Sequence, residues 1–378
     1  HGGPSLAALL KPQFRKPQFG YRRDWSTAAK HSISRGHRGV GQGFEPMKVL
    51  VTGATGFIGG NLARMLWRDG YQVRALVRPG SNTKAIDDTG IEPVAGDILD
   101  RGSVARAARG CQALFHCAAI YSFWNPDPSL VYRTNVDGTA NVLDAAGDAG
   151  VGKIVYTSTV STIGFSSSGP GNEETPIDPT RFAGAYKRSK YQAEQVALGK
   201  ADQGLPVVVV NPTAPVGPWD VKPTPTGRII LDFLKGRIPA YLNSGMNLVD
   251  VEDVAAGHIL AMEKGRPGQR YILGNMNVTL RQLFSTLGDI SGLRPPRWRA
   301  PFWLVTMAGY LDQMVEGNLM GREPRIPVEG IKVARHPMYV DCAKAVGELG
   351  LPQSPVERAL ENAMEWFADF GYLKSKAT

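Results

Sequence analysis

The feature that most constrains the fold of this chain is a glycine-rich turn between an apolar strand and a helix. Residues 47–82 read MKVLVTGATGFIGGNLARMLWRDGYQVRALVRPGSN. The β-branched run before the turn and the apolar residues at helical spacing after it predict a strand, a turn, a helix and a second strand. Gly53, Gly56 and Gly59 let the backbone turn tightly, approach a pyrophosphate and pack the helix against a sheet. The spacing is GxxGxxG, a variant of GxGxxG, and in this context we favour a dinucleotide site over a purely structural turn.

Strand and helix patterns keep alternating after the glycine turn. We expect strands in IEPVAGDILD, QALFHCAA and KIVYTSTVS, with helices between them. Such alternation predicts an α/β fold with a Rossmann-type, doubly wound parallel sheet. Residues 47–211 should form this dinucleotide-binding domain. Pro- and Gly-containing loops follow, so residues 212–378 should form mainly a smaller C-terminal substrate-binding lobe, with some segments returning to the Rossmann core.

Residues 1–46 form a basic leader that differs from the rest of the chain. They begin with His1 and contain eight Lys or Arg residues against two acidic ones, so they supply +6 of the formal charge of +9. They show no hydrophobic periodicity, and we expect them to be disordered. We favour Met47 as the native start, with an upstream extension before it. The composition also suits a targeting peptide, which would imply organellar import.

The remaining residues have the composition of a soluble enzyme. Their formal charge is only +3, and they contain no basic run that would suit nucleic acid. Three cysteines without CxxC spacing favour a reducing compartment, and no stretch approaches the roughly 18 apolar residues of a membrane span. We therefore expect a cytoplasmic protein with no nucleic-acid partner, no stable membrane span and no metal site.

The residue that reads the ribose is expected about 20 positions after the glycine turn. Arg78 stands there. Because a guanidinium can bind a 2′-phosphate that a carboxylate would repel, we predict NADP(H) as the preferred cofactor, with NAD(H) as the alternative. Lys84 is a second candidate contact to the phosphate.

Further cofactor contacts are expected where strands end, because ligands of such sheets lie beyond the carboxyl ends of the strands. Asp97 and Ile98 should meet the adenine, whereas we interpret His116 as a packed strand-end histidine. The cofactor-binding candidates at the strand ends are Gly53, Thr55, Gly56, Phe57, Ile58, Asp97, Ile98, Cys117, Ala118, Ala119 and Thr157.

A candidate catalytic pair lies in the helical segment AYKRSKYQAEQVAL. Tyr186 and Lys190 are four residues apart and therefore share one helix face. The ammonium, together with an oxidised nicotinamide, would stabilise the tyrosine phenolate, and a phenol so tuned can exchange a proton with a substrate hydroxyl. We choose Thr159 as the hydroxyl that orients the substrate oxygen, and expect Ser158 to support the strand end.

The motifs TGATGFIGG, HCAA, YTSTVSTIG and AYKRSK together resemble the extended short-chain dehydrogenase/reductase superfamily, of the NAD-dependent epimerase/dehydratase type. Downstream, VVVVNPTAPVGPWDVKPTPTGRII, LVDVEDVAAGHILAMEKG and GQRYILGNMNVTL resemble the hopanoid-associated sugar epimerase family over residues 47–372. YRTNVDGT and GYQVRALVRPGSN are similar to dihydroflavonol 4-reductases that use NADP.

This resemblance implies roles for particular residues. It implies Thr159, Tyr186 and Lys190 as the catalytic set, with Tyr186 and Lys190 also contacting the cofactor. It implies Asn135 as a structural or proton-relay member, and places Pro212 and Thr213 beside the nicotinamide. Many members carry serine at the position of Thr159, and threonine retains the hydroxyl. By analogy, the resemblance implies a homodimer.

Specificity should reside in aromatic and polar residues near the catalytic set and in the lobe. Our substrate-binding candidates are Tyr121, Trp124, Thr159, Trp219 and Asn243. The candidates for lining the same pocket are Phe123, Tyr241 and Met246.

The apolar segment 301–314, PFWLVTMAGYLDQM, could cover a lipid-like substrate or touch a membrane surface. We favour a packed helix of the lobe, because the segment lacks the cationic face of an interfacial helix. Asp253 and His258 lie in an Ala-rich helical stretch and are predicted to be structural.

These residues predict hydride transfer at a secondary alcohol or ketone of a sugar, a nucleotide sugar or a polycyclic or lipid-like carbonyl compound. One hypothesis is an epimerase resembling the hopanoid-associated sugar epimerases, which oxidises and re-reduces its substrate without net use of cofactor. The alternative is a carbonyl reductase resembling dihydroflavonol 4-reductase, which consumes NADPH. A third hypothesis is a dinucleotide-binding regulator without catalysis, but such proteins typically lose the tyrosine or lysine that this chain keeps.

Overall fold

The structure is a computed structural model that describes residues 46–166, 169–182 and 184–373. The predictions made for the leader therefore concern residues outside the described part, apart from Pro46. Every statement below refers to the described ranges.

A seven-stranded parallel sheet forms the centre of the molecule, in the order β3-β2-β1-β4-β5-β6-β10. The strands are β1 (Lys48–Thr52), β2 (Gln72–Val77), β3 (Glu92–Ala95), β4 (Ala113–His116), β5 (Lys153–Thr157), β6 (Val207–Pro212) and β10 (Arg270–Leu273). The order reverses between β1 and β4, which is the topological switch point where ligands of such sheets bind. The predicted doubly wound Rossmann-type sheet is thereby confirmed.

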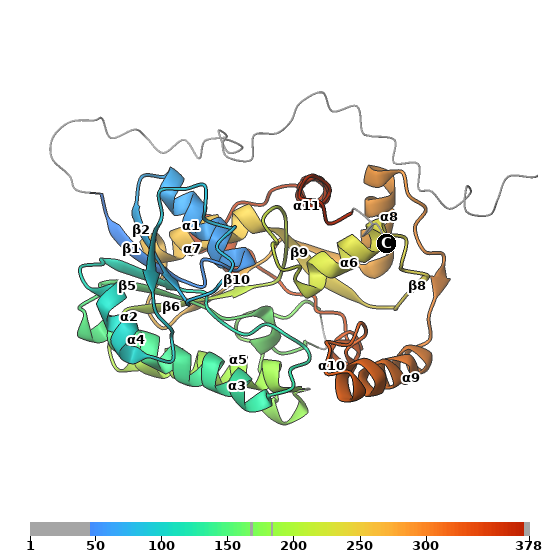
Figure 1. Ribbon diagram of the computed structural model, residues 1–378, viewed down its shortest axis with the longest axis horizontal. Helices are drawn as coiled ribbons and strands as arrows, with labels where there is room; N and C mark the ends of the chain where they lie inside the picture. The colour runs from blue at the N-terminus through green and yellow to red at the C-terminus, as the bar shows by residue number, and fades with distance from the viewer. Residues whose placement is uncertain (1–45, 167–168, 183, 374–378) are drawn as a thin grey trace, which may run out of the picture. The chain divides into compact units, whose positions relative to one another are not determined.

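Helices cover both faces of the sheet (Figure 1). One face carries α1 (Phe57–Arg68) and α7 (Val251–Lys264), and the other carries α2 (Arg101–Ala108), α4 (Gly138–Asp148) and α5 (Gly184–Asp202). Because successive strand residues point to opposite faces, Val49 of β1 packs in the core beneath α1 and α7, whereas Leu50 packs in the core beneath α2, α4 and α5. This double burial explains why the central strands read as continuous apolar runs.

The second half of the chain divides between the main sheet and a group of smaller sheets and helices, which we call the lobe. Helix α7 and strand β10 return to the sheet. The strands of the lobe are β7 (Ala214–Val216), β9 (Gly245–Asp250) and β11 (Met276–Thr279) in one small sheet, and β8 (Ala240–Tyr241) and β12 (Trp298–Arg299) in another. Its helices are α6 (Pro225–Leu234), α8 (Leu280–Ser291), α9 (Phe302–Asp312), α10 (Val328–Val333) and α11 (Val356–Asp369).

Short helical segments connect these elements. They are α3 (Pro128–Tyr132), the π-helical η1 (Arg133–Asp137), η4 (Gln313–Leu319) and η5 (Ala345–Leu349), and the 3₁₀ turns η2 (Val160–Thr162) and η3 (Pro179–Arg181).

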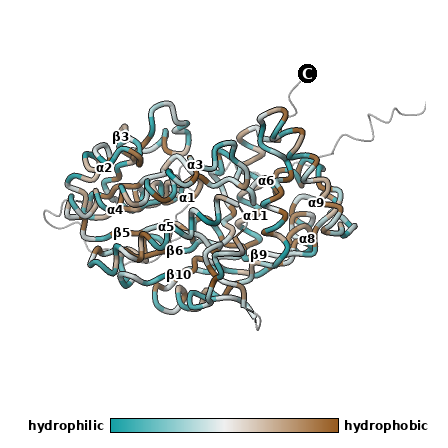
Figure 2. The backbone as a smooth tube through the Cα atoms, turned by 90° about the horizontal axis from the view of Figure 1, so that it is seen from below, coloured by the Kyte–Doolittle hydropathy of each residue, from teal (hydrophilic) through white to brown (hydrophobic). Residues whose placement is uncertain are grey.

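Helix α9 corrects the expectation that segment 301–314 is packed inside the lobe. Gly309 is its only buried residue, whereas Trp303 is 68% exposed and Leu311 is 57% exposed. In Figure 2 the tube at α9 is largely brown, so this exposed helix is also strongly apolar. No helix in the described ranges has both the length and the apolarity needed to cross a membrane.

Two buried histidines join the sheet to its covering helices. His116, at the end of β4, lies 2.7 Å from the Thr52 hydroxyl and 3.0 Å from that of Thr139 on α4. His258, on α7, donates from Nδ1 to the Val254 carbonyl at 2.7 Å and accepts at Nε2 from the Thr157 hydroxyl at 2.9 Å. Burial lowers the pKa of His116 to about 3 and that of His258 to about 4. Both are structural, as predicted.

We predict that His258→Gln changes how stability depends on pH. Between pH 6.5 and about 4, His258 takes up a proton in the unfolded chain but stays neutral in the folded one. Its contribution is therefore complete above pH 6.5 and is lost as the pH falls toward 4. The free energy of unfolding of the parent minus that of the variant should drop by about 1.4 kcal/mol per pH unit across this window.

Urea unfolding at several pH values measures this difference. His336→Gln is the matched control, because His336 is exposed. Parallel pH profiles for the parent and His258→Gln would contradict the assignment.

Candidate active site

Most of the predicted cofactor residues meet at one edge of the sheet, where the parallel strands end. Residues 53–58 follow β1, Arg78 follows β2, and residues 117–119 follow β4. Thr157 and Pro212 are the last residues of β5 and β6. The structure therefore brings together segments that are more than 150 residues apart in the sequence.

The glycine turn after β1 shows why this position requires glycine. Gly53 has φ +77°, and a Cβ there would lie 2.6 Å from the backbone nitrogen of Ala118. A Cβ on Gly59 would lie 2.3 Å from the Gly53 carbonyl oxygen, so α1 could not approach the turn. Gly56 caps α1 without a side-chain hydrogen bond, and the first turn of α1 holds no acidic residue. An uncapped helix start beside a tight turn suits the pyrophosphate of a dinucleotide.

The residues predicted to contact the adenosine half of the cofactor differ in how exposed they are. Arg78 is exposed directly after β2, and residues 78–86 contain no acidic side chain. The Lys84 ammonium lies 4.7 Å from the centre of the Phe370 ring, so it also holds the loop against the C-terminal segment. Ile98 is only 5% exposed and packs against Gly138, which makes it a core residue. Asp97 accepts a hydrogen bond from the Leu99 nitrogen at 2.9 Å.

Tyr186 lies near the start of α5 and is buried against two aromatic rings. The Tyr121 ring centre lies 4.9 Å away, and the Phe123 ring stands edge-on at 6.1 Å. Burial raises the pKa of the Tyr186 phenol, and a hydrogen bond with the Thr159 side chain opposes this shift. The structure thus brings Thr159 and Tyr186 together, although they come from different elements.

Lys190 is placed differently from our expectation. Its ammonium donates to the Tyr156 hydroxyl at 3.0 Å and to the Thr157 carbonyl at 2.8 Å. Burial lowers its pKa to about 8, against the opposing effect of Glu194. The long side chain of Lys190 thus turns toward the end of β5, and the groups that shift the pKa of Tyr186 are Thr159 and Glu329.

Asn135, in the π-helical segment η1, holds the loop that carries the aromatic rings. Its Oδ1 accepts from the Ile120 nitrogen at 2.8 Å, and its Nδ2 donates to the Ile120 carbonyl and to the Ser189 hydroxyl. Both ends of the amide are engaged in these bonds. Of the two roles left open by the sequence, the contacts favour the structural one.

A pocket of about 300 Å³ opens beside Tyr186. Trp124 lines it, as predicted, and so does Phe123. The lining residues that sequence reasoning missed include Tyr310, Glu329 and Lys332. They come from α9 and α10, more than 120 residues after Tyr186, and no motif marks them.

Glu329 is a carboxyl group at the edge of this pocket. Burial raises its pKa to about 7, and its charge in turn raises the pKa of Tyr186. Within the described part of the chain, its Oε1 is buried without a hydrogen-bond partner. A Cβ on Gly184, where φ is +77°, would collide with this carboxyl group. Glycine at this position therefore lets α5 begin against α10.

Of the five predicted substrate residues, only Trp124 lines this pocket. Tyr121 lies next to it, with its ring against Tyr186, and Thr159 interacts with the Tyr186 side chain, whereas Trp219 and Asn243 lie elsewhere. Trp219 is 6% exposed, and its ring packs against Trp366, Phe370 and the Arg64 guanidinium, which lies 3.8 Å from the ring centre. The prediction that Trp219 contacts the substrate is therefore wrong, because this side chain packs inside the lobe. Asn243 is exposed on the loop after β8 and does not line the pocket.

Asp253 has a structural role, because its carboxylate accepts from the Ser354 nitrogen and hydroxyl. Among residues 46–166, 169–182 and 184–373, no group of three His, Cys, Asp or Glu side chains could hold a metal ion.

The sheet order, the glycine turn and the Thr159, Tyr186 and Lys190 set define an NAD(P)-dependent enzyme of the extended short-chain dehydrogenase/reductase type. The chain belongs to the NAD dependent epimerase/dehydratase family, whose family model matches residues 49–274.

Individual relatives agree with this membership. A protein of Synechocystis sp. named "Putative dihydroflavonol 4-reductase" is 48% identical over 332 residues, which cover 86% of this chain and 96% of the relative. Sterol demethylase protein B of Methylococcus capsulatus is 35% identical and matches over its whole length, covering 86% of this chain. The crystal structure of gox2253 is 41% identical, with a TM-score of 0.77, and the match covers 86% of this chain and 99% of that one.

We predict that Gly53→Ala destabilises the fold and abolishes binding of the nicotinamide dinucleotide. The matched control is Gly70→Ala, because Gly70 has a similar φ of +86° but open space around its Cβ position. A left-handed alanine costs about 1–2 kcal/mol at either site. Gly53→Ala should lower the free energy of unfolding by about 2 kcal/mol more, because its Cβ also meets the backbone of β4.

Urea unfolding measures the stability, and calorimetry with NADPH measures the binding. Equal effects of Gly53→Ala and Gly70→Ala on stability and on cofactor binding would contradict the prediction. They would show that the contact between a Cβ at position 53 and the Ala118 backbone has no cost.

Proposed function

We propose that the protein reduces the ketone of an apolar small molecule to a secondary alcohol, using NADPH. The observation that carries this proposal is the buried Tyr186 phenol, which lies against the Tyr121 and Phe123 rings beside a pocket lined by further aromatic rings. Because burial raises the pKa of the phenol, Tyr186 stays protonated at neutral pH. A protonated phenol is the form that a reductase needs as its general acid.

In this mechanism the Thr159 hydroxyl donates a hydrogen bond to the substrate oxygen and fixes its position. Tyr186 then donates its phenolic proton to the same oxygen as negative charge develops there. Lys190 holds the end of β5 through Tyr156 and Thr157, and so positions the segment that leads from β5 to Thr159. NADPH, when bound, supplies the hydride that reduces the carbonyl carbon.

The chain's own residues suit this cofactor at three places. The turn at Gly53 and Gly56 and the start of α1 would hold the pyrophosphate. Arg78 would bind the 2′-phosphate, which is why we propose NADP(H) over NAD(H). Pro212 and Thr213, at the end of β6, would border the nicotinamide.

A second candidate function is epimerisation. It is favoured by membership of the epimerase/dehydratase family and by the motifs that resemble hopanoid-associated sugar epimerases. A screen of ketones, sugars and nucleotide sugars with the purified protein separates the two functions. A reductase steadily depletes the absorbance of the reduced nicotinamide, whereas an epimerase converts its substrate without a steady change.

We predict that Tyr186→Phe lowers kcat about 10²–10⁴-fold with any substrate found in the screen, because the variant lacks the proton donor. NADPH affinity should stay within about twofold of the parent. Tyr191→Phe is the control, since Tyr191 lies on the same helix and packs against Phe182. Undiminished turnover by Tyr186→Phe would refute the proposed role.

We predict that Arg78→Ala weakens NADPH binding about 10–100-fold, the worth of one or two charge-assisted hydrogen bonds. NADH binding should change little, because NADH has no 2′-phosphate. Arg109→Ala serves as the control, because Arg109 is exposed where α2 leads into the opposite end of β4. Titration calorimetry with both cofactors measures the effect, and an equal loss for NADPH and NADH would exclude Arg78 as the phosphate ligand.

A further inference from the structure

Most of the exposed large hydrophobic residues in the described ranges lie on α9 and the segments beside it in the sequence. Of the 17 exposed large hydrophobic residues in the described ranges, 11 fall within residues 298–326. They are Trp298, Trp303, Leu304, Met307, Tyr310, Leu311, Met314, Val315, Leu319, Met320 and Ile326. We call these residues the α9 face. Single exposed apolar residues are ordinary, but a concentration of this kind marks an interaction surface.

Helix α9 is apolar on all its sides. Its sequence, FWLVTMAGYLD, contains Thr306 and Asp312 as its main polar residues. The helix touches α10 at Gly309, where a Cβ would lie 2.4 Å from the Ile331 side chain. Of its other ten residues, five are exposed and five are half-buried. A helix that is apolar all round is normally buried in protein or in a membrane. With 11 residues it reaches only about 16 Å, roughly half the thickness of the hydrocarbon layer.

The charges around the α9 face are mainly positive. Seven exposed basic residues flank it in the sequence: Arg294, Arg297, Arg299, Arg322, Arg325, Lys332 and Arg335. Residues 294–335 contain four acidic side chains, three of which are engaged elsewhere. The Asp312 carboxylate accepts from the Ile326 nitrogen, Glu323 pairs with Arg228, and Glu329 lies in the active-site pocket. The cationic residues that α9 itself lacks are therefore supplied by its neighbours.

We propose that the α9 face docks on the surface of an anionic phospholipid bilayer. Its tryptophan, leucine and methionine side chains would enter the interfacial layer, and the flanking arginines would meet the lipid phosphates. A second copy of the chain fits less well, because a twofold contact through this face would bring the basic residues that flank α9 in the two copies toward one another. The α9 face and the basic residues that flank it together match an anionic lipid surface.

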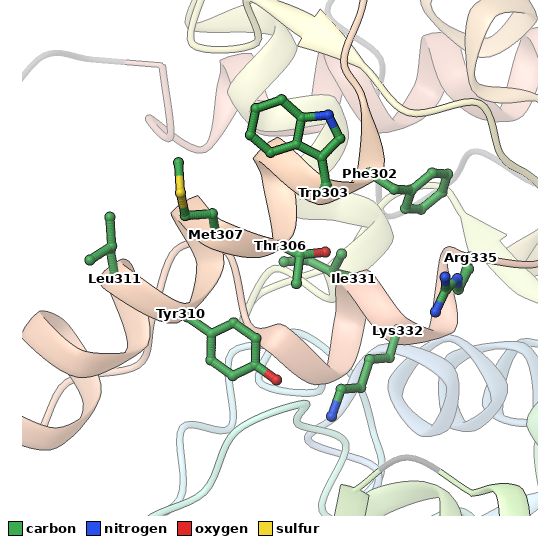
Figure 3. A pocket seen from close by; sticks show the side chains of 9 residues that line it. All are labelled: Phe302, Trp303, Thr306, Met307, Tyr310, Leu311, Ile331, Lys332 and Arg335. Atoms are coloured by element: carbon green, nitrogen blue, oxygen red, sulfur yellow. The ribbon is translucent and has the colours of Figure 1, made fainter.

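The α9 face also reaches the active site. A second pocket, of about 690 Å³, lies between α9 and α10 and is lined by Trp303, Met307 and Leu311, with Lys332 and Arg335 as its charged residues. Tyr310 and Lys332 line both this pocket and the one beside Tyr186. In Figure 3 these two side chains point to the same side of the pocket. If the proposed reductase function holds, an apolar substrate could reach Tyr186 directly from the lipid layer.

Vesicle sedimentation with the full chain tests the docking. We expect binding to vesicles of phosphatidylcholine mixed with phosphatidylglycerol, and much weaker binding to phosphatidylcholine alone. The double variant Trp303→Glu/Leu311→Glu should bind the mixed vesicles at least about tenfold more weakly, because two side chains that enter the lipid become charged. Replacing Arg297 and Arg299 by Gln should weaken binding about fivefold per residue.

The control is Met276→Glu/Val346→Glu, which adds the same charge at exposed apolar positions outside the α9 face. The basic residues 1–45 are identical in all variants, so their attraction to anionic lipid does not affect the comparison. Urea unfolding shows whether each variant keeps its fold.

Equal vesicle binding by the parent and Trp303→Glu/Leu311→Glu would overturn the proposal, and so would a parent that binds neither kind of vesicle. Light scattering that shows a dimer without lipid, broken by the same variant, would assign the face to a second copy instead. Because sedimentation needs no turnover, failure of the docking can be told apart from failure of the proposed reductase function.

Discussion

The geometry of the active-site edge depends on one close backbone contact, between the turn after β1, the first turn of α1 and the end of β4. Gly53 faces the backbone of Ala118, and Gly59 faces the Gly53 carbonyl, at distances that leave no room for a Cβ. Because these segments are locked together, the start of α1 is fixed at the switch point of the sheet. The strands beside β1 and β4 then set the positions of Arg78 and Thr157.

A second interaction connects this edge to the lobe. The buried Arg64 guanidinium of α1 forms a two-pronged ion pair with Asp88, donates to the Ala85 carbonyl and lies over the Trp219 ring. This pairing holds the pKa of Asp88 below its usual range. One side chain thus anchors both the loop that carries Arg78 and the start of the lobe. Breaking such a pair would leave a buried charge unmatched, so these contacts stabilise the packing of the loop and the start of the lobe against α1.

The sequence predicted what local patterns encode. The glycine turn, the alternating strands and the Tyr186 helix are short-range signals, and parallel strand ends necessarily meet at one edge, which brought Thr159 to Tyr186. Contacts with distant segments carry no such signal, so Glu329 and Lys332 were missed. The sequence showed that Trp219 and α9 are apolar, but it did not show whether other segments cover them. In the structure Trp219 is buried, and α9 is exposed. Helical spacing correctly placed Lys190 on the same face of the helix as Tyr186. It could not predict that the long lysine side chain turns toward Tyr156 and Thr157.

The electrostatics of the pocket argue for a neutral substrate. Burial raises the pKa values of Tyr186 and Glu329 and lowers that of Lys190, so in all three cases it disfavours the charged form. A nucleotide diphosphate placed here would bring several negative charges toward Glu329, with Lys332 as the one basic side chain in the pocket lining. A neutral carbonyl compound meets aromatic rings and a protonated phenol instead. In the reduction that we propose, the same loss of solvent would keep the proton on Tyr186 until the carbonyl oxygen becomes basic enough to take it.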